Sequence, residues 1–261
     1  MATLTPILRA RIAAKRYPGI GGAPAHLALQ ELAVNVAAGE FVALVGPSGC
    51  GKTTFLNIVA GLDHDFTGEV ALLPGDNGRE PRVGYVFQNP RLLPWRTVRE
   101  NLALVLRPDQ DPTIVDRLLR AVELEAARDV FPGRLSGGMS RRAAIARAFV
   151  VDPDLLLMDE PFVSLDEDSA GRLRDLLLQL WRTRPTTVLF VTHDLREAVF
   201  LADRLLLLSP APGRVLAEVP VPLPRDERGD RAATDRLYRE IGARHRLLVE
   251  EANGGVTRSS L

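Results

Sequence analysis

The stretch Phe41-Val-Ala-Leu-Val-Gly-Pro-Ser-Gly-Cys-Gly-Lys-Thr-Thr54 decides the fold of this chain. Its apolar start, Phe41–Val45, predicts a strand buried on both faces, and a glycine-rich turn follows directly. The residues from Thr53 to Ala60 predict a helix that ends at Gly61. A buried strand that leads through such a turn into a helix is typical of an α/β protein with a largely parallel sheet.

The turn in this stretch fits the phosphate-binding P-loop pattern Gly-x-x-x-x-Gly-Lys-Thr. Its glycines let successive backbone N–H groups face one anion, and the helix N-terminus adds partial positive charge. Lys52 then reaches the β- and γ-phosphates, and the Thr53 hydroxyl is placed for Mg²⁺. The alternative is a glycine-rich turn without a ligand, which the ordered strand, loop, lysine and threonine disfavour. The predicted ATP-binding residues are Gly46, Pro47, Ser48, Gly49, Cys50, Gly51, Lys52, Thr53 and Thr54.

A second apolar strand, Leu155–Asp159, ends in two carboxylates. Asp159 should lie at the carboxyl edge of the sheet, where such sheets bind ligands, and could hold Mg²⁺ through water. Glu160 could polarise an attacking water as a general base. A strand end of this kind is usually only solvated, but its combination with a P-loop favours the catalytic interpretation.

Composition limits the possible partners of the 261-residue chain. Lys and Arg together number 33, as do Asp and Glu, so the formal net charge is zero. No global positive field would attract nucleic acid or anionic lipid, and we predict no nucleic-acid partner. No apolar run approaches the roughly 20 residues that span a bilayer. The lone Cys50 excludes an internal disulfide, and Met1–Ala10 shows no secretory signal, so the sequence predicts a cytosolic protein.

The sequence divides into a large domain and a C-terminal appendage. We expect one domain over residues 1–224, with a helical subdomain inserted at about 90–150, and a charged helix and tail over 225–261. Asp111 and Pro112 form a good helix start in the inserted part, and the residues after them place an apolar stripe on one helical face.

The motif Leu135-Ser-Gly-Gly-Met139 precedes a helix-forming stretch, Ser140–Val150, and resembles the signature of ABC ATPases. Ser136 is a good N-cap, and the glycines leave backbone N–H groups for a second anion site. Four further segments resemble the family's companions in the family's order. These are Gln88 for the Q-loop, Ser164-Leu-Asp166 for the D-loop, His193 for the H-loop and Tyr17 for the aromatic residue that stacks on adenine.

This resemblance covers about residues 10–220 and implies a RecA-like P-loop NTPase sheet core, with a helical insertion and a small antiparallel β region near the N-terminus. It implies catalytic roles for Lys52, Glu160 and His193, and Mg²⁺ ligation by Thr53, Gln88 and Asp159. It also implies a head-to-tail homodimer. In this dimer, the signature and D-loop of one protomer face the ATP of the other through Ser136, Gly137, Gly138, Met139 and Asp166.

Finer details resemble ABC importers of the nitrate, sulfonate and taurine group: Arg91-Leu-Leu-Pro-Trp95, Met139 and Leu208–Arg214. Such importers combine the ATPase pair with two integral-membrane permease subunits and an external solute-binding protein, at the cytoplasmic face of the inner membrane. Arg141 departs from that group, which usually has glutamine there. Three alternatives remain: a soluble ABC-type ATPase of DNA repair or translation, an inert nucleotide-binding scaffold, and an exporter half.

Overall fold

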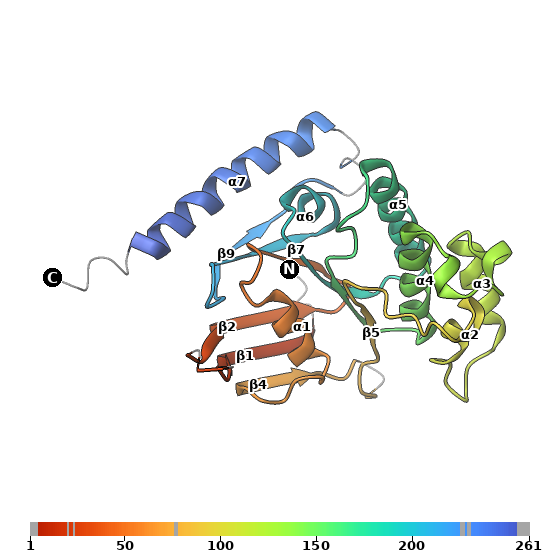
Figure 1. Ribbon diagram of the computed structural model, residues 1–261. Helices are drawn as coiled ribbons and strands as arrows, with labels where there is room; N and C mark the ends of the chain where they lie inside the picture. Colours follow the sequence, from red (N-terminus) through yellow and green to blue (C-terminus); the bar gives the residue numbers. More distant parts are fainter. Residues whose placement is uncertain are drawn as a thin grey trace. The chain divides into compact units, whose positions relative to one another are not determined.

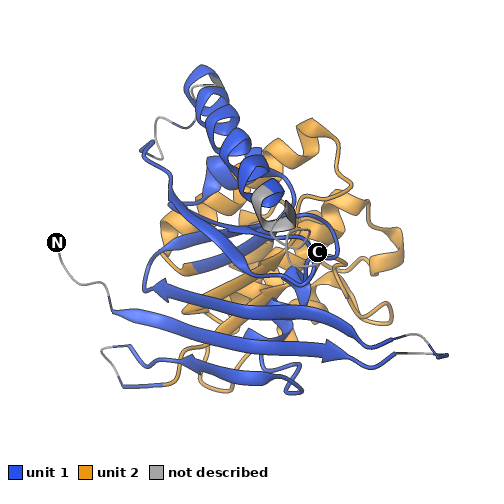
Figure 2. Cartoon of the chain, turned by 90° about the vertical axis from the view of Figure 1, so that its left-hand side faces the viewer, with its two compact units in different colours: residues 1–79, 188–261 blue, residues 80–187 orange. Residues whose placement is uncertain are grey.

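The computed structural model describes residues 5–19, 21–22, 24–75, 78–224, 228 and 231–254, of which 231 and 251–254 are described by backbone alone. They form two compact units (Figure 2). Unit 1 combines residues 1–79 with 188–261, and unit 2 consists of residues 80–187. The chain therefore leaves unit 1 after its first strands and returns to it later.

The first sheet of unit 1 is antiparallel and has the order β2-β1-β4 (Figure 1). Its strands are β1 (Pro6–Tyr17), β2 (His26–Ala37) and β4 (Thr67–Leu72). In β1, Leu8, Ala10 and Ile12 are buried while Arg9 and Arg11 between them are exposed. This alternation is typical of a sheet with one face on the core and the other in water. The predicted small antiparallel region is confirmed.

The second sheet contains the strand that opens the P-loop. In unit 1, β3 (Phe41–Val45) lies between β7 (Thr187–Thr192) and β8 (Arg204–Leu208) and is parallel to both, while β9 (Val215–Pro220) runs antiparallel to β8. Every residue of β3 and β7 is buried. Continuous burial is expected for parallel strands covered on both faces, and the predicted α/β class is confirmed.

Three α-helices lie in the described part of unit 1. Helix α1 (Lys52–Val59) follows the P-loop, α6 (Leu195–Leu201) follows β7, and α7 (Arg231–Gly254) is the long C-terminal helix. Helix α7 packs on α6 and β9, where Ile241 is buried. The expected tail after it, residues 255–261, and residues 225–227 and 229–230 before it lie outside the described residues.

Unit 2 is built around one helix. Strands β5 (Val83–Val86) and β6 (Leu155–Asp159) are parallel, and the helices are α2 (Val98–Ala103), α3 (Thr113–Ala121), α4 (Gly137–Val150) and α5 (Glu167–Thr183), with short 3-10 turns at Glu125–Ala127 and Pro132–Arg134. Helix α4 packs against α2, α3, α5 and β5 (Figure 1). The segment predicted to be helical from Ser140 begins at Gly137, because the Ser136 hydroxyl accepts the Met139 N–H and caps the helix. Within the described residues, no helix is both long and apolar enough to cross a membrane.

Candidate functional site

The predicted P-loop closes around its lysine. Lys52 Nζ donates hydrogen bonds to the carbonyls of Gly46 at 2.8 Å and Pro47 at 3.0 Å. The lysine side chain is 5% exposed. Gly51, with φ of 97°, is the N-cap of α1, and no side chain caps this helix start. The loop therefore places a fixed cation beside a helix N-terminus, which is the arrangement that favours a phosphate.

The loop rests on a backbone support that only glycine permits. A Cβ on Gly51 would lie 2.8 Å from the Ala28 carbonyl oxygen, and a Cβ on Gly213 would overlap the carbonyl oxygen of Cys50. Gly213 N donates to Ala28 O at 2.9 Å, and Gln30 N donates to Gly213 O at 3.1 Å. These contacts with strand β2 and with the loop after β8 thus fix the position of the P-loop. The segment Leu208–Arg214 resembles a family marker in the sequence, and nothing in that sequence predicts the role of Gly213.

Tyr17, predicted to stack on adenine, lies at the first turn of α1. Its hydroxyl is 3.2 Å from Thr54 Oγ1, and its side chain is 37% exposed. Lys15 Nζ sits 4.7 Å from the centre of the ring and donates to Asp63 Oδ1 at 2.9 Å. Burial alone would raise the pKa of Asp63, but the hydrogen bonds from Lys15 and the Asp65 N–H, together with the charge of Lys15, outweigh it and hold that pKa below its usual value. The network fixes an aromatic ring beside the P-loop helix, and sequence analysis missed both Lys15 and Asp63.

His193 lies in the same unit as the P-loop, directly after β7. The preceding residue, Thr192, accepts the Gly46 N–H on its carbonyl at 3.4 Å. The Thr192 hydroxyl accepts the N–H of Asp194 and donates to Glu197, so the turn that carries His193 is braced on both sides. The His193 side chain is exposed. Unit 1 therefore gathers Tyr17, the P-loop and His193.

Unit 2 holds the acidic strand end. Asp159 is 3% exposed, and Glu160 adopts a left-handed backbone with φ of 42°. The Tyr85 ring stacks on Phe87 at 3.9 Å between ring centres. Burial and the charge of Asp159 both raise the pKa of the Tyr85 phenol, so this side chain stays neutral beside the carboxylate. Gln88 follows β5 on an exposed turn of the same unit.

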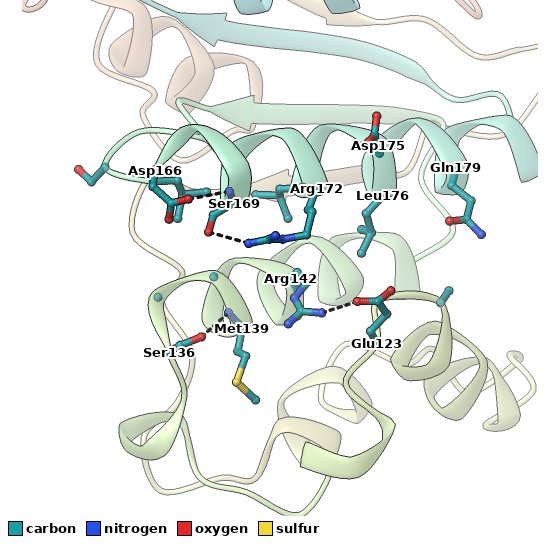
Figure 3. Close-up of a pocket in the computed structure, with 16 residues that line it drawn as sticks. Glu123, Ser136, Met139, Arg142, Asp166, Ser169, Arg172, Asp175, Leu176 and Gln179 are labelled. Carbon is teal, nitrogen blue, oxygen red and sulfur yellow. Dashed lines mark hydrogen bonds and ion pairs between the residues drawn. The ribbon is translucent and has the colours of Figure 1, made fainter.

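A pocket of about 640 Å³ in unit 2 brings the signature and the D-loop together (Figure 3). One wall is the start of α4, where Met139 N donates to Ser136 Oγ at 3.2 Å. The other is the start of α5, where Ser169 N donates to Asp166 Oδ1 at 2.9 Å. The predicted signature residues that line the pocket are Ser136, Gly137, Gly138 and Met139. Two cationic residues, Arg142 and Arg172, and three acidic residues, Glu123, Asp166 and Asp175, also line it (Figure 3).

The predicted Mg²⁺ ligands supply hard oxygen donors of three kinds. They are the Thr53 hydroxyl in unit 1 and the Gln88 amide and Asp159 carboxylate in unit 2. In the described part of the chain, no cluster of three or more His, Cys, Asp or Glu side chains could form a complete metal cage. Mg²⁺ is usually bound by one or two carboxylates together with water and phosphate oxygens, so this donor set fits the ion.

Similarity to known proteins identifies the family of the chain. The ABC transporter family profile matches residues 29–163. The chain is 46% identical over 237 residues to the aliphatic sulfonates import ATP-binding protein SsuB 2 of Burkholderia cenocepacia (strain HI2424), covering 88% of this chain and 85% of that protein. It is 48% identical over 217 residues to SsuB 1 of Pseudomonas aeruginosa (strain UCBPP-PA14), covering 80% and 86%.

Solved structures agree with the sequence relatives. The dimeric post-hydrolysis state of the ATP-binding cassette MJ0796, bound to ADP and Pi, is 32% identical, with a TM-score of 0.69 over 82% of this chain and 98% of that one. Another dimeric structure of MJ0796, described as a bacterial ABC transporter cassette, gives a TM-score of 0.70. The chain therefore belongs to the ABC transporter family, whose ATP-hydrolysing cassette it carries.

Proposed function

We propose that this chain is the ATPase subunit of an importer for sulfonate-like solutes, in the range of sulfonates, taurine and nitrate. The similarity to aliphatic sulfonates import ATP-binding proteins over most of both chains supports this solute class. Two copies would bind two permease subunits at the cytoplasmic face of the inner membrane and receive solute from an external binding protein. The main competing proposal is a soluble ABC-type ATPase that is not coupled to transport.

The roles proposed for the P-loop unit follow from its fixed groups. Lys52 contributes a point charge to the β- and γ-phosphates of ATP, and backbone N–H groups at the start of α1 bind phosphate oxygens. Tyr17 offers an aromatic face to adenine, and Lys15 occupies a position over the same ring. His193 contacts the γ-phosphate.

The roles proposed for unit 2 concern the attacking water and the metal. Glu160 accepts a proton from the water that attacks the γ-phosphate. Thr53 of unit 1 and Gln88 and Asp159 of unit 2 are the residues that would hold Mg²⁺, and the ion would neutralise charge on the phosphates. Gln88 also transmits the state of the γ-phosphate to the permease.

The observation that carries the proposal of a head-to-tail dimer is the pocket of unit 2, where the start of the signature helix meets the D-loop. Two N-terminal glycines of α4 and the D-loop line this pocket. One chain needs only one cradle for a γ-phosphate, so we propose that Ser136–Gly138 close over ATP held by the partner's P-loop. ATP binding then drives dimerisation, and hydrolysis releases the dimer.

The test is Glu160→Gln, which keeps side-chain size and hydrogen bonding but removes the base. We expect intact ATP binding, arrested hydrolysis and a dimer with two trapped nucleotides, measured by light scattering with MgATP. Adding Ser136→Arg should abolish that dimer, because a bulky cation would occupy the phosphate pocket. Both variants should be repeated in the assembled transporter. Hydrolysis at the native rate by Glu160→Gln in both settings would show that Glu160 is not the base.

Trp95 distinguishes the importer from a soluble ATPase. Its side chain is 69% exposed, on the segment that follows Gln88. A large exposed aromatic residue is a common anchor in protein interfaces. We propose that Gln88–Trp95 contacts a permease helix, so Trp95→Ala should weaken assembly with the permease or uncouple transport, while the isolated chain still binds ATP. Unchanged assembly and transport would show that Trp95 is not the permease contact, whereas a native chain that assembles with no permease would favour the soluble alternative.

A further inference from the structure

Unit 2 contains several non-glycine residues with left-handed backbone. Three of them belong to the functional loops: Arg91 after the Q-loop with φ of 46°, Glu160 with φ of 42° and Ser164 in the D-loop with φ of 63°. A fourth, Glu123 with φ of 56°, lines the signature pocket. Such a conformation strains any residue with a Cβ and persists only where the surroundings enforce it. The structure must therefore hold these turns from outside.

Helix α4 supplies the restraint on the loop of Glu160. Arg141 Nη1 donates to Pro161 O at 3.0 Å, and Arg141 Nη2 donates to Val163 O at 2.5 Å. These two carbonyls lie between the strained residues Glu160 and Ser164. One guanidinium therefore fixes the main chain immediately after the proposed base and immediately before the D-loop serine.

The same guanidinium reaches the Q-loop. Arg141 Nη1 also donates to the Gln88 carbonyl at 3.2 Å. Two turns further along α4, Arg147 donates to the carbonyls of Pro90 and Arg91, both at 2.8 Å. Arg147 thus restrains the strained turn at Arg91 alone, whereas Arg141 joins the Q-loop and the Glu160–Ser164 loop.

The third arginine of α4 follows the same pattern. Arg142 Nη1 donates to Val122 O at 3.1 Å, directly before the strained Glu123, and forms an ion pair with the Glu123 carboxylate. Each arginine of α4 thus binds a carbonyl at or next to a left-handed non-glycine residue. The repetition on one helix indicates a common role in supporting these turns.

We propose that Arg141 is a positioning residue for ATP hydrolysis: it ties the Q-loop and the loop of Glu160 to the helix that begins at the signature. This rests on the role of Glu160 proposed above. The backbone that follows Glu160 is then fixed by the helix that carries the signature at its start. Movement of that helix would be transmitted to the base and to Gln88 through one side chain.

The chemistry of arginine suits this task better than the glutamine usual at this position. A guanidinium has five N–H donors in a rigid fork, and hydrogen bonds from a charged donor are stronger than those from a neutral amide. A glutamine amide has two N–H donors on a shorter side chain. It cannot reach all three carbonyls with the same geometry.

The first experiment measures amide hydrogen exchange in the nucleotide-free chain, where no catalytic role is needed. The reporters are Val163 N, bonded to Glu160 O at 3.2 Å, and Leu165 N, bonded to Phe162 O at 3.3 Å. Arg141→Gln should speed their exchange about tenfold, the factor expected for losing one hydrogen bond from a charged group. Arg141→Lys should give a smaller increase. Arg147→Gln is the matched control, and should leave both reporters unchanged.

The second experiment measures steady-state ATP hydrolysis. Arg141→Gln should lower kcat about tenfold and leave KM for MgATP within about twofold, because the P-loop cradle lies in unit 1 and keeps its contacts. Arg141→Lys should recover part of kcat. The inference is wrong if Val163 and Leu165 exchange at native rates, if Arg147→Gln accelerates them equally, or if kcat is unchanged. A native chain that hydrolyses no ATP would instead contradict the proposed function and leave the exchange result as the test of the restraint.

Discussion

The P-loop of unit 1 and the proposed catalytic loops of unit 2 both contain residues with left-handed backbone, but different residue types adopt it. In the P-loop, the left-handed positions are glycines, Gly49 with φ of 80° and Gly51 with φ of 97°. In the described loops of unit 2 that carry the proposed Q-loop, base and D-loop, they are Arg91, Glu160 and Ser164. The left-handed positions of a P-loop bind phosphate through their main-chain N–H groups and can dispense with side chains. A loop that must present a carboxylate cannot, so it needs support from outside.

The largest effect should come from Lys52→Ala, which breaks the unit 1 side of this comparison. Lys52 is the cation that the loop carbonyls hold at 2.8 and 3.0 Å. Its loss should weaken MgATP binding at least about tenfold, since one charged contact of this kind is worth about 1.5–3 kcal/mol. Hydrolysis should nearly disappear. Equilibrium binding and steady-state turnover measure the two effects, and native turnover would overturn the P-loop assignment.

The support beneath the P-loop should be nearly as sensitive. Gly213→Ala places a Cβ against the carbonyl oxygen of Cys50, and backbone atoms cannot move aside cheaply. We expect a loss of about 1–3 kcal/mol in the free energy of unfolding, typical of overpacking, together with weaker ATP binding. Gly133→Ala is the control, because a Cβ there meets no atom within 4 Å. Equal unfolding curves for Gly213→Ala and Gly133→Ala would show that the contact is not tight.

The sequence could predict features formed by consecutive residues but not contacts between residues far apart in the chain. The strand, turn and helix of the P-loop are consecutive in the chain, so the motif predicted them together, and the same holds for the strand before Glu160. Local chemistry also predicted the cap at Ser136. Lys15 and Asp63, or Gly213 and Cys50, are brought together only by the fold. Neither spacing nor periodicity carries a signal for such pairs.

Arg141 is the clearest example of contacts that the sequence could not reveal. The sequence indicated only that it departs from the glutamine usual in the group that the chain resembles. The structure instead places it half-buried, with main-chain carbonyls of two distant loops as acceptors. Side-chain bonds to the backbone depend on where each carbonyl points, and that direction is set by the left-handed residues nearby. No residue type in the sequence encodes it.

The smallest effect should come from Ser164→Gly. This change places glycine at a left-handed position of a unit 2 loop, as the P-loop of unit 1 already does. Glycine adopts φ of 63° without strain, although it also gains entropy in the unfolded chain, so we expect stabilisation of at most about 1 kcal/mol by thermal unfolding. Gly49→Ala is the mirror control: nothing lies within 4 Å of an added Cβ there, so the backbone alone should destabilise it by about 1 kcal/mol.

Combining Ser164→Gly with Arg141→Gln tests whether Arg141 acts on the strained turn at Ser164. If arginine supplies the restraint that a left-handed serine needs, glycine at 164 should reduce that need. Arg141→Gln should then accelerate Leu165 amide exchange less in the Ser164→Gly background than in the native one, because the turn no longer depends on external support. An equal acceleration in both backgrounds would mean that Arg141 does not act on the strained turn, and the difference between the two units would then need another physical cause.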